Sequence, residues 1–207
     1  RSDSVDKLDL YTNCMEEIKK RTEVITEHLN GGYNEKYLIT ETEFLCVQLR
    51  KVLENIALAS LVANKEKYSS VRKNFASDWN AKRILNDLEE ANPNFYPKPT
   101  EQIRKPDGTF SMVDITKGFL TKDQFVHLYN KCGELLHADN PYGNKKNFEI
   151  FYSQIGNWLK KIITLLNHHV ITLSDETIII ALMQSDEDGK PHTTLFKEKN
   201  AFERDGY

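Results

Sequence analysis

The amino-acid sequence predicts a mainly α protein: a five-helix, bundle-like domain with a long proline-rich excursion between helices three and four, and a C-terminal β-hairpin. Three observations lead to this prediction. Five segments repeat apolar residues at three- and four-residue steps, as the buried face of an amphipathic helix requires. Residues 92–121 contain four of the six prolines, and residues 177–197 are rich in β-forming residues. We expect residues 1–170 to form the helical domain and residues 171–207 a hairpin packed on it.

Composition narrows the class of protein. The 207 residues are 39% hydrophobic and 29% charged, which is ordinary for one folded domain, and the net charge of -3 indicates no general affinity for nucleic acid. The cysteines, Cys14, Cys46 and Cys132, are odd in number and lack C-x-x-C spacing, so we expect reduced thiols in a cytoplasmic protein. No apolar run approaches the length of a membrane span, and residues 1–4 do not resemble a signal peptide.

The first three helices follow from their apolar faces and end signals. The first is expected over residues 4–30, where Asn30-Gly31-Gly32 stops it. The second is expected from residue 40 or 42 to residue 64, and because it is apolar almost all round after Val52 it should be the central helix. The third is expected over residues 77–91, with Ser77 as its cap and Trp79 facing inward.

Proline interrupts the helical pattern over residues 92–121. Within this excursion, residues 102–105 and 109–114 flank Pro106-Asp107-Gly108, which predicts a small hairpin. Loops of this length are often functional.

The remaining elements complete the prediction. Thr121 and Gln124 form a capping box that begins helix four, and Asn140-Pro141 is expected to end it. Helix five is expected over residues 145–169, closed by His168-His169. The final hairpin should pair residues 177–183 with residues 193–197 across a turn at residues 185–190.

The end of helix four gathers polar and titratable side chains, namely Lys131, His137, Asp139 and Asn140. A histidine there can act as a base or acid near neutral pH, and a lysine can hold a phosphate, which together suit RNA cleavage by an adjacent 2′-hydroxyl. Lys131 and His137 are six positions apart, which places them about 120° apart on an unbroken helix. They share a site only where the last turn unwinds.

Each of these residues also has a purely structural interpretation. His137 can compensate the helix dipole or bond to a local carbonyl, and Lys131 can be a solvated helix lysine. Asp139 and Asn140 are common turn residues before proline. Cys132 lies on the apolar face and is typical of a small core residue. No spacing of His, Cys or carboxylate residues indicates a metal site.

The motif resembles that of the HEPN superfamily of small α-helical domains: an arginine, four to six residues, then a histidine, with Asn, Asp or His usually following the arginine. Here Lys131 stands at the arginine position, Cys132 at its neighbour and His137 at the histidine. The resemblance implies an RNA- or nucleotide-binding protein, with metal-independent RNase activity in a toxin or antiviral defence system as one function. It implies no cofactor and a homodimer whose two motifs face one cleft. Arg50 and Glu54 of helix two would support the site. In their structural interpretation, the i, i+4 spacing instead predicts an intrahelical ion pair.

A second function from another class also fits the sequence. The chain can be a non-catalytic dimerisation or interaction module that presents its excursion and C-terminal hairpin to a partner protein. A domain that binds RNA or nucleotide without cutting it lies between the two.

Overall fold

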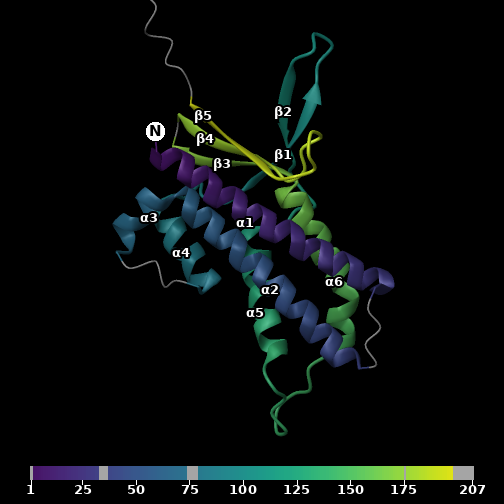
Figure 1. The fold of residues 1–207 in the computed structure, drawn as a ribbon. Coiled ribbons are helices and arrows are strands. Elements are labelled where there is room, and N and C mark those ends of the chain that lie inside the picture. The colour runs from purple at the N-terminus through teal and green to yellow at the C-terminus, as the bar shows by residue number, and fades with distance from the viewer. Residues whose placement is uncertain (1, 33–36, 74–78, 175, 198–207) are drawn as a thin grey trace, which may run out of the picture.

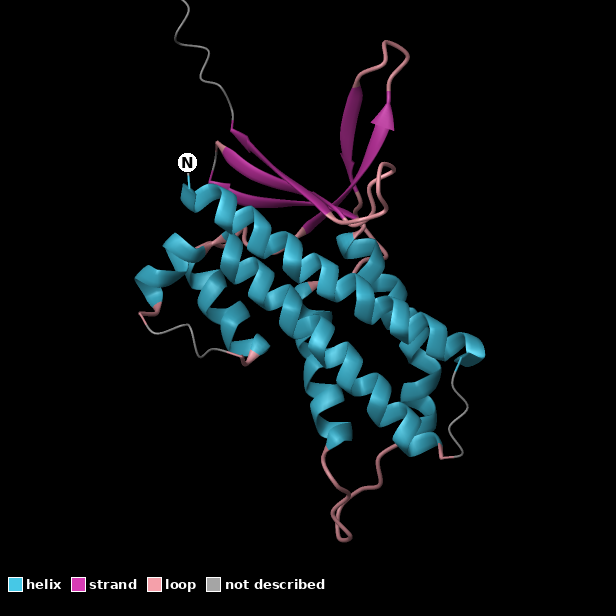
Figure 2. Ribbon diagram, viewed as in Figure 1, coloured by secondary structure: helices cyan, strands magenta, loops and turns pink. Residues whose placement is uncertain are grey.

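The computed structural model describes residues 2–32, 37–73, 79–174 and 176–197. Figures 1 and 2 show a layer of long helices with a twisted sheet across one end. The helical elements are α1 (Ser2–Glu27), a π-helical turn η1 (His28–Gly32), α2 (Leu38–Ala63), α3 (Lys65–Val71), α4 (Ala81–Ala91), α5 (Lys122–Leu136) and α6 (Phe148–Leu166). The strands are β1 (Lys98–Arg104), β2 (Phe110–Asp114), β3 (His168–Ser174), β4 (Thr177–Leu182) and β5 (His192–Lys197).

Helix α2 occupies the centre of the helical layer, as its sequence predicts. It runs beside α1 and also contacts α4, α5 and α6 (Figure 1). Its inward residues from Leu45 to Ala63 are almost completely shielded from solvent. A helix that is apolar nearly all round is stable only when neighbours cover most of its surface. The core of the domain is therefore built around this helix.

The predicted fold class is wrong, because the protein is a mixed α and β fold and not a mainly α one with a single hairpin. The described residues also contain a helix that the sequence did not predict, α3. All five strands form one antiparallel sheet in the order β2-β1-β3-β4-β5. Ile171, Ile179 and Ala181 of the sheet are buried in the same core as the helices. The sheet is thus part of the domain's core.

The prediction failed at β3, because helix five was expected to continue to residue 169. Helix α6 ends at Leu166, and His168 and His169 begin a strand whose next residues are the β-branched Val170, Ile171 and Thr172. Both histidines are buried and neither closes a helix. Strand β3 also pairs with β1, where Lys98 lies opposite Val170, and this pairing joins the two predicted hairpins. It links segments about 70 residues apart, which no local pattern reveals.

Both predicted hairpins are confirmed. Strands β1 and β2 pair around Pro106-Asp107-Gly108, where Gly108 has the positive φ of 84° that favours glycine. Strand β1 begins earlier than expected, at Lys98, and its hairpin projects from the body of the molecule (Figure 1). Strands β4 and β5 form the C-terminal hairpin across the expected turn.

Helices α4 and α5 also differ from expectation, each at one end. Helix α4 begins at Ala81 with Asn80 as its cap; Trp79 precedes it with 66% of its surface exposed, so it does not face inward. The expected cap, Ser77, lies outside the described residues. Helix α5 has the predicted capping box at Thr121 and Gln124, but it ends at Leu136, before the Asn140-Pro141 stop.

Candidate functional site

His137 is the C-terminal cap of α5. Its N–H donates to the carbonyl of Glu134 (3.3 Å) and its backbone is extended, so the chain leaves the helix at this residue. The carbonyl of His137 accepts a hydrogen bond from the Lys146 amino group, and the residue is exposed to solvent. The imidazole therefore stands at a helix end that a lysine from the following loop holds in place.

The loop between α5 and α6 contains the other two residues predicted near the histidine. The carboxylate of Asp139 pairs with the same Lys146 amino group (3.2 Å), and the Asn140 side chain accepts from the N–H of Tyr142 (3.0 Å). Asn140 thus shapes a turn, as its structural interpretation predicts. Lys146 ties the start of this loop to its end.

Lys131 lies on another side of α5, in a hollow of about 270 Å³ between α5 and α6. Its amino group pairs with Glu134 at 3.0 Å, and Glu134 lines the same hollow. His137 is not among the residues that line it. Lys131 and His137 therefore do not share this hollow.

Aromatic and amide side chains form the rest of the hollow. Trp158 of α6 lies beside His127 of α5, with their ring centroids 6.1 Å apart, and the Lys161 amino group lies 5.0 Å from the indole centroid. Gln154 and Asn147 add amide groups, and the Asn147 side chain caps α6 by accepting from the N–H of Ile150 (2.9 Å). The positive end of the α6 dipole is therefore at this hollow. A lysine, a flat aromatic surface and amides therefore line one hollow.

Arg50 and Glu54 form the predicted intrahelical ion pair on α2 (3.3 Å), and Arg50 contacts a third face of α5. The guanidinium of Arg50 lies over the Tyr129 ring, 4.1 Å from its centroid, and donates to the Tyr129 hydroxyl at 2.7 Å. Burial raises the pKa of Tyr129, and the nearby Arg50 opposes that rise. Three-quarters of the Arg50 side chain is shielded, and only 14% of that of Glu54 is exposed. This cluster fastens α2 to α5.

Gly133 makes room for that cluster. A Cβ at this position would lie 2.8 Å from a terminal nitrogen of Arg50. Alanine favours helix by about 1 kcal/mol over glycine, but here it would displace a guanidinium that is already stacked and hydrogen-bonded. We expect Gly133→Ala to destabilise the natural protein by about 1 kcal/mol and to stabilise an Arg50→Met variant by about as much.

Urea unfolding of the two single variants and the double variant measures this coupling. If Gly133→Ala changed the free energy of unfolding equally in the natural protein and in the Arg50→Met variant, the position of Arg50 would not depend on the absence of a side chain at residue 133.

The six predicted site residues thus separate into three groups around α5. Lys146 fixes His137 and Asp139 at the end of α5, where Asn140 shapes the turn, and the α5–α6 hollow contains Lys131. Arg50, paired with Glu54, binds Tyr129 on the α2 side. Sequence reasoning missed Lys146 and the pairing of His127 with Trp158. The four-residue spacing of His127 and Lys131 places both on one helical face and was the available signal.

Cys132 is buried beside Cys46 of α2. The hydrogen bond with Cys46 and burial both raise the pKa of the Cys132 thiol. A thiol that stays protonated is a poor nucleophile. Cys132 is therefore a core residue, in agreement with its structural interpretation.

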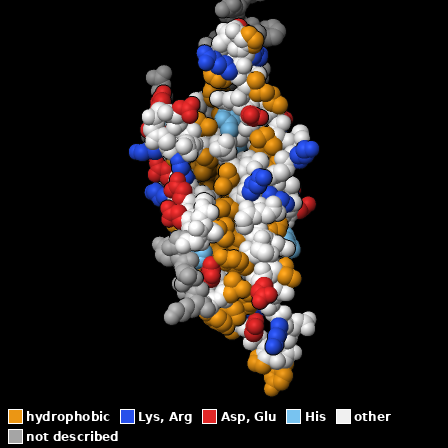
Figure 3. Space-filling view, turned by 90° about the vertical axis from the view of Figure 1, so that its right-hand side faces the viewer, with side chains coloured by type: hydrophobic (Ala, Val, Ile, Leu, Met, Phe, Trp, Pro, Cys, Tyr) orange, Lys and Arg blue, Asp and Glu red, His pale blue; other side chains and the backbone are white. Residues whose placement is uncertain are grey.

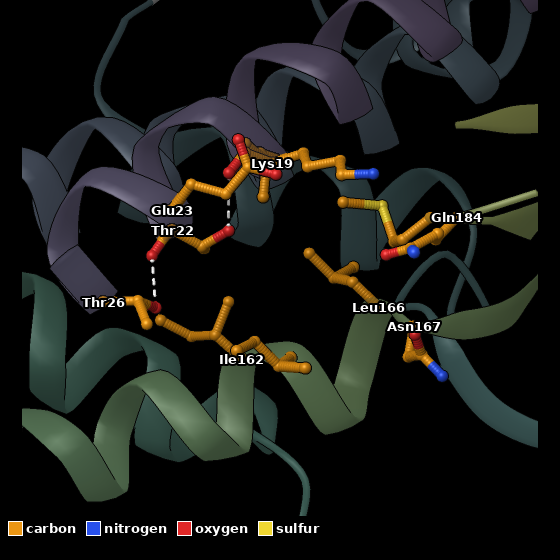
Figure 4. A pocket seen from close by; sticks show the side chains of 11 residues that line it. Lys19, Thr22, Glu23, Thr26, Ile162, Leu166, Asn167 and Gln184 are labelled. Atoms are coloured by element: carbon orange, nitrogen blue, oxygen red, sulfur yellow. Dashed lines mark hydrogen bonds between the residues drawn. The ribbon is translucent and has the colours of Figure 1, made fainter. Parts of the chain in front are cut away.

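A second hollow, of about 180 Å³, lies between α1, α6 and the end of β4 (Figure 4). Figure 4 shows Lys19, Thr22 and Thr26 of α1 opposite Ile162 and Leu166 of α6. The Lys19 amino group bonds to the Gly189 carbonyl, and both threonine hydroxyls bond to carbonyls of their own helix at 2.8 Å. Hydrophobic side chains also run in a band along this side of the molecule (Figure 3). These polar groups are already used within the protein, and none of the described aromatic side chains lines this hollow. The α5–α6 hollow, which Trp158 lines, is therefore the stronger candidate.

Comparison of the chain with protein-family models, with curated proteins and with solved structures finds no match. Within the described residues, no group of three His, Cys, Asp or Glu side chains is arranged to hold a metal ion. None of the helices described is long and apolar enough to cross a membrane.

Proposed function

We propose that this chain is a HEPN-like domain that binds single-stranded RNA or a nucleotide in the α5–α6 hollow. The observation that carries the proposal is the meeting of Lys131, Trp158 and His127 around one hollow of about 270 Å³. This volume is near the lower limit for ligand pockets, which suits one nucleotide unit better than a larger ligand. The indole offers a stacking surface for a base, and Lys131 offers a charge for its phosphate.

The ion pair between Lys131 and Glu134 does not prevent phosphate binding. Both side chains are about a third or more exposed, and such surface pairs contribute about 0–1 kcal/mol. The terminal phosphate of a nucleotide carries more negative charge than a carboxylate, an RNA phosphodiester carries the same charge, and the N-terminus of α6 favours either anion there. A phosphate can therefore replace Glu134 at the lysine.

Cleavage is a further step of the proposal and rests on His137. In a metal-independent RNase the imidazole would take the proton of the attacking 2′-hydroxyl or give a proton to the leaving 5′-oxygen. A single chain places His137 at the end of α5 and Lys131 in the hollow, so cleavage would require the homodimer that the HEPN resemblance implies, with the histidine of one copy reaching RNA held by the other. The three free cysteines support a reducing cytoplasm as the setting.

We expect Trp158→Leu and Lys131→Gln each to weaken binding of a fluorescently labelled single-stranded RNA about tenfold or more. Loss of base stacking costs about 1–3 kcal/mol, and 1.4 kcal/mol corresponds to a factor of ten. Removal of the competing carboxylate by Glu134→Gln should tighten binding severalfold. Fluorescence anisotropy at low salt measures the RNA affinity of all three variants.

Two controls make this test specific. Trp79→Leu removes an exposed tryptophan outside the hollow and should leave RNA affinity unchanged. Equal losses for the two tryptophan variants, or no RNA binding at all, would contradict the proposal. Gel analysis of the same RNA with the natural protein and with His137→Ala tests cleavage separately, because cutting that persists in the variant would exclude His137 as the catalytic residue.

A further inference from the structure

Strand β2 forms one edge of the five-stranded sheet, and it is unusually apolar for an edge. Phe110, Met112 and Val113 are 63%, 44% and 46% exposed, and the strand itself, Phe110–Asp114, contains neither lysine nor proline. Natural edge strands usually carry such residues, which prevent pairing with another strand. The hairpin also extends beyond the body of the protein, so neighbouring elements do not obstruct the edge (Figure 2).

The hydrogen bonds of the hairpin show which backbone groups are available at this edge. The N–H of Lys105 donates to the Thr109 carbonyl (2.7 Å), and that of Ile115 donates to the Pro99 carbonyl (2.9 Å). Bonded and non-bonded pairs alternate along an antiparallel ladder. Ser111 and Val113 therefore direct their backbone groups toward β1. Phe110, Met112 and Asp114 direct theirs outward.

The outward groups are complementary to those of a second β2 strand. When two copies run antiparallel with Ser111 on the two-fold axis, Phe110 of each copy lies opposite Met112 of the other. The outward N–H and carbonyl groups of these two residues then meet in the narrow, doubly bonded arrangement. Their side chains lie on the same face, so an aromatic ring packs against a thioether twice across the seam.

The charges fit the same register. Asp114 comes opposite Gly108 of the second copy, in the turn that also contains Lys105. The carboxylate of Asp107 in that turn is already bonded to the N–H and hydroxyl of Thr109 (2.9 and 2.6 Å), and these bonds lower its pKa. Asp107 is an anion and repels Asp114 of the other copy, so Lys105 is the charge in that turn that can pair with this aspartate.

We propose that two copies of this chain pair through their β2 strands, antiparallel and with Ser111 on the two-fold axis, to form one continuous ten-stranded sheet. This surface lies at the end of the molecule away from the loop between α5 and α6 (Figure 1). The pairing thus differs from the dimer that the HEPN resemblance implies, with its two motifs in one cleft, and it does not rest on RNA binding.

Sedimentation velocity over a concentration series tests the pairing. The natural protein should dimerise, and Phe110→Lys should raise the dissociation constant about tenfold or more, because it places two charges against apolar partners. The matched control is Ile103→Lys, which adds the same charge at a residue 47% exposed on β1, the inner strand of the hairpin. A monomeric natural protein, or equal dissociation by both variants, would overturn the proposal. If the natural protein is monomeric, the edge of β2 would instead be available to a strand of another protein.

Mixing two weakened variants tests the register itself. Phe110→Lys and Met112→Glu should each be mainly monomeric, and their mixture should form a heterodimer. In that heterodimer the introduced lysine of one chain faces the introduced glutamate of the other, and the unchanged Met112 faces the unchanged Phe110. A register shifted by one hydrogen-bonded pair would place residue 110 opposite residue 114. In that register, mixing the two variants would not restore dimerisation. Failure of the mixture to associate therefore excludes this arrangement.

Discussion

When the pH falls from about 7 to about 4, the free energy of unfolding is expected to fall by about 3 kcal/mol more in the natural protein than in a Tyr11→Phe/His169→Leu variant. His169 is fully buried where β3 begins. Its Nδ1 lies 2.8 Å from the Leu166 carbonyl, which can only accept, so Nδ1 carries the proton. Its Nε2 then accepts from the Tyr11 hydroxyl at 2.7 Å. No position remains in this arrangement for a second proton.

Burial is the main reason that the pKa of His169 falls from 6.5 to about 4 in the folded protein. Between these two values the unfolded chain binds a proton that the folded chain does not, so acid favours unfolding. The stabilisation is complete above the unfolded pKa and is lost progressively as the pH falls toward about 4.

Urea unfolding at several pH values measures this difference. The double variant removes the hydroxyl together with its acceptor, so neither polar group is left buried alone. His168, whose pKa burial also lowers, is present in both proteins, and its charge is a smaller cause of the low pKa of His169. Parallel pH profiles for the two proteins would show that His169 is not the source of the acid sensitivity.

Asn92→Ala is expected to destabilise the protein by about 3 kcal/mol, the largest effect that we expect of a single amide in this fold. Its side-chain nitrogen donates to the Asn64 side chain (2.7 Å) and to the Thr172 carbonyl (2.9 Å), and its oxygen accepts from the Asn94 N–H (3.2 Å). This one side chain connects the end of α2, the end of α4 and strand β3. The variant would leave buried polar groups without partners.

Circular dichroism during urea unfolding checks this expectation. Asn92→Asp keeps the acceptor but loses both donors and buries a charge, so it should be at least as destabilising. Asn86→Ala, at an exposed position of the same helix, is the control and should change stability by less than about 0.5 kcal/mol. A loss for Asn92→Ala as small as that of the control would mean that other contacts hold the sheet on the helices.

The candidate site was predictable in parts. The capping box at Thr121 fixed the start of α5, and the spacing of Arg50 and Glu54 gave their ion pair. The end of α5 was harder to predict from the sequence, because Lys146 binds the His137 carbonyl from nine residues away. Likewise, the hollow around Lys131 depends on Trp158, which a different helix supplies. Helical spacing gives the face on which a side chain lies, but not which element faces it.

The sequence by itself determined the elements whose causes lie within a few residues: the buried face of α2, the cap at Thr121 and the turns of both hairpins. Only the tertiary structure decided that β1 pairs with β3, that His168 and His169 lie in a strand, and that Lys131 and His137 occupy separate surfaces. The physical reason is the range of the interactions. Helix periodicity, caps and turns depend on neighbours about four residues away, whereas strand pairing and hollows depend on contacts that exist only after distant segments have packed together.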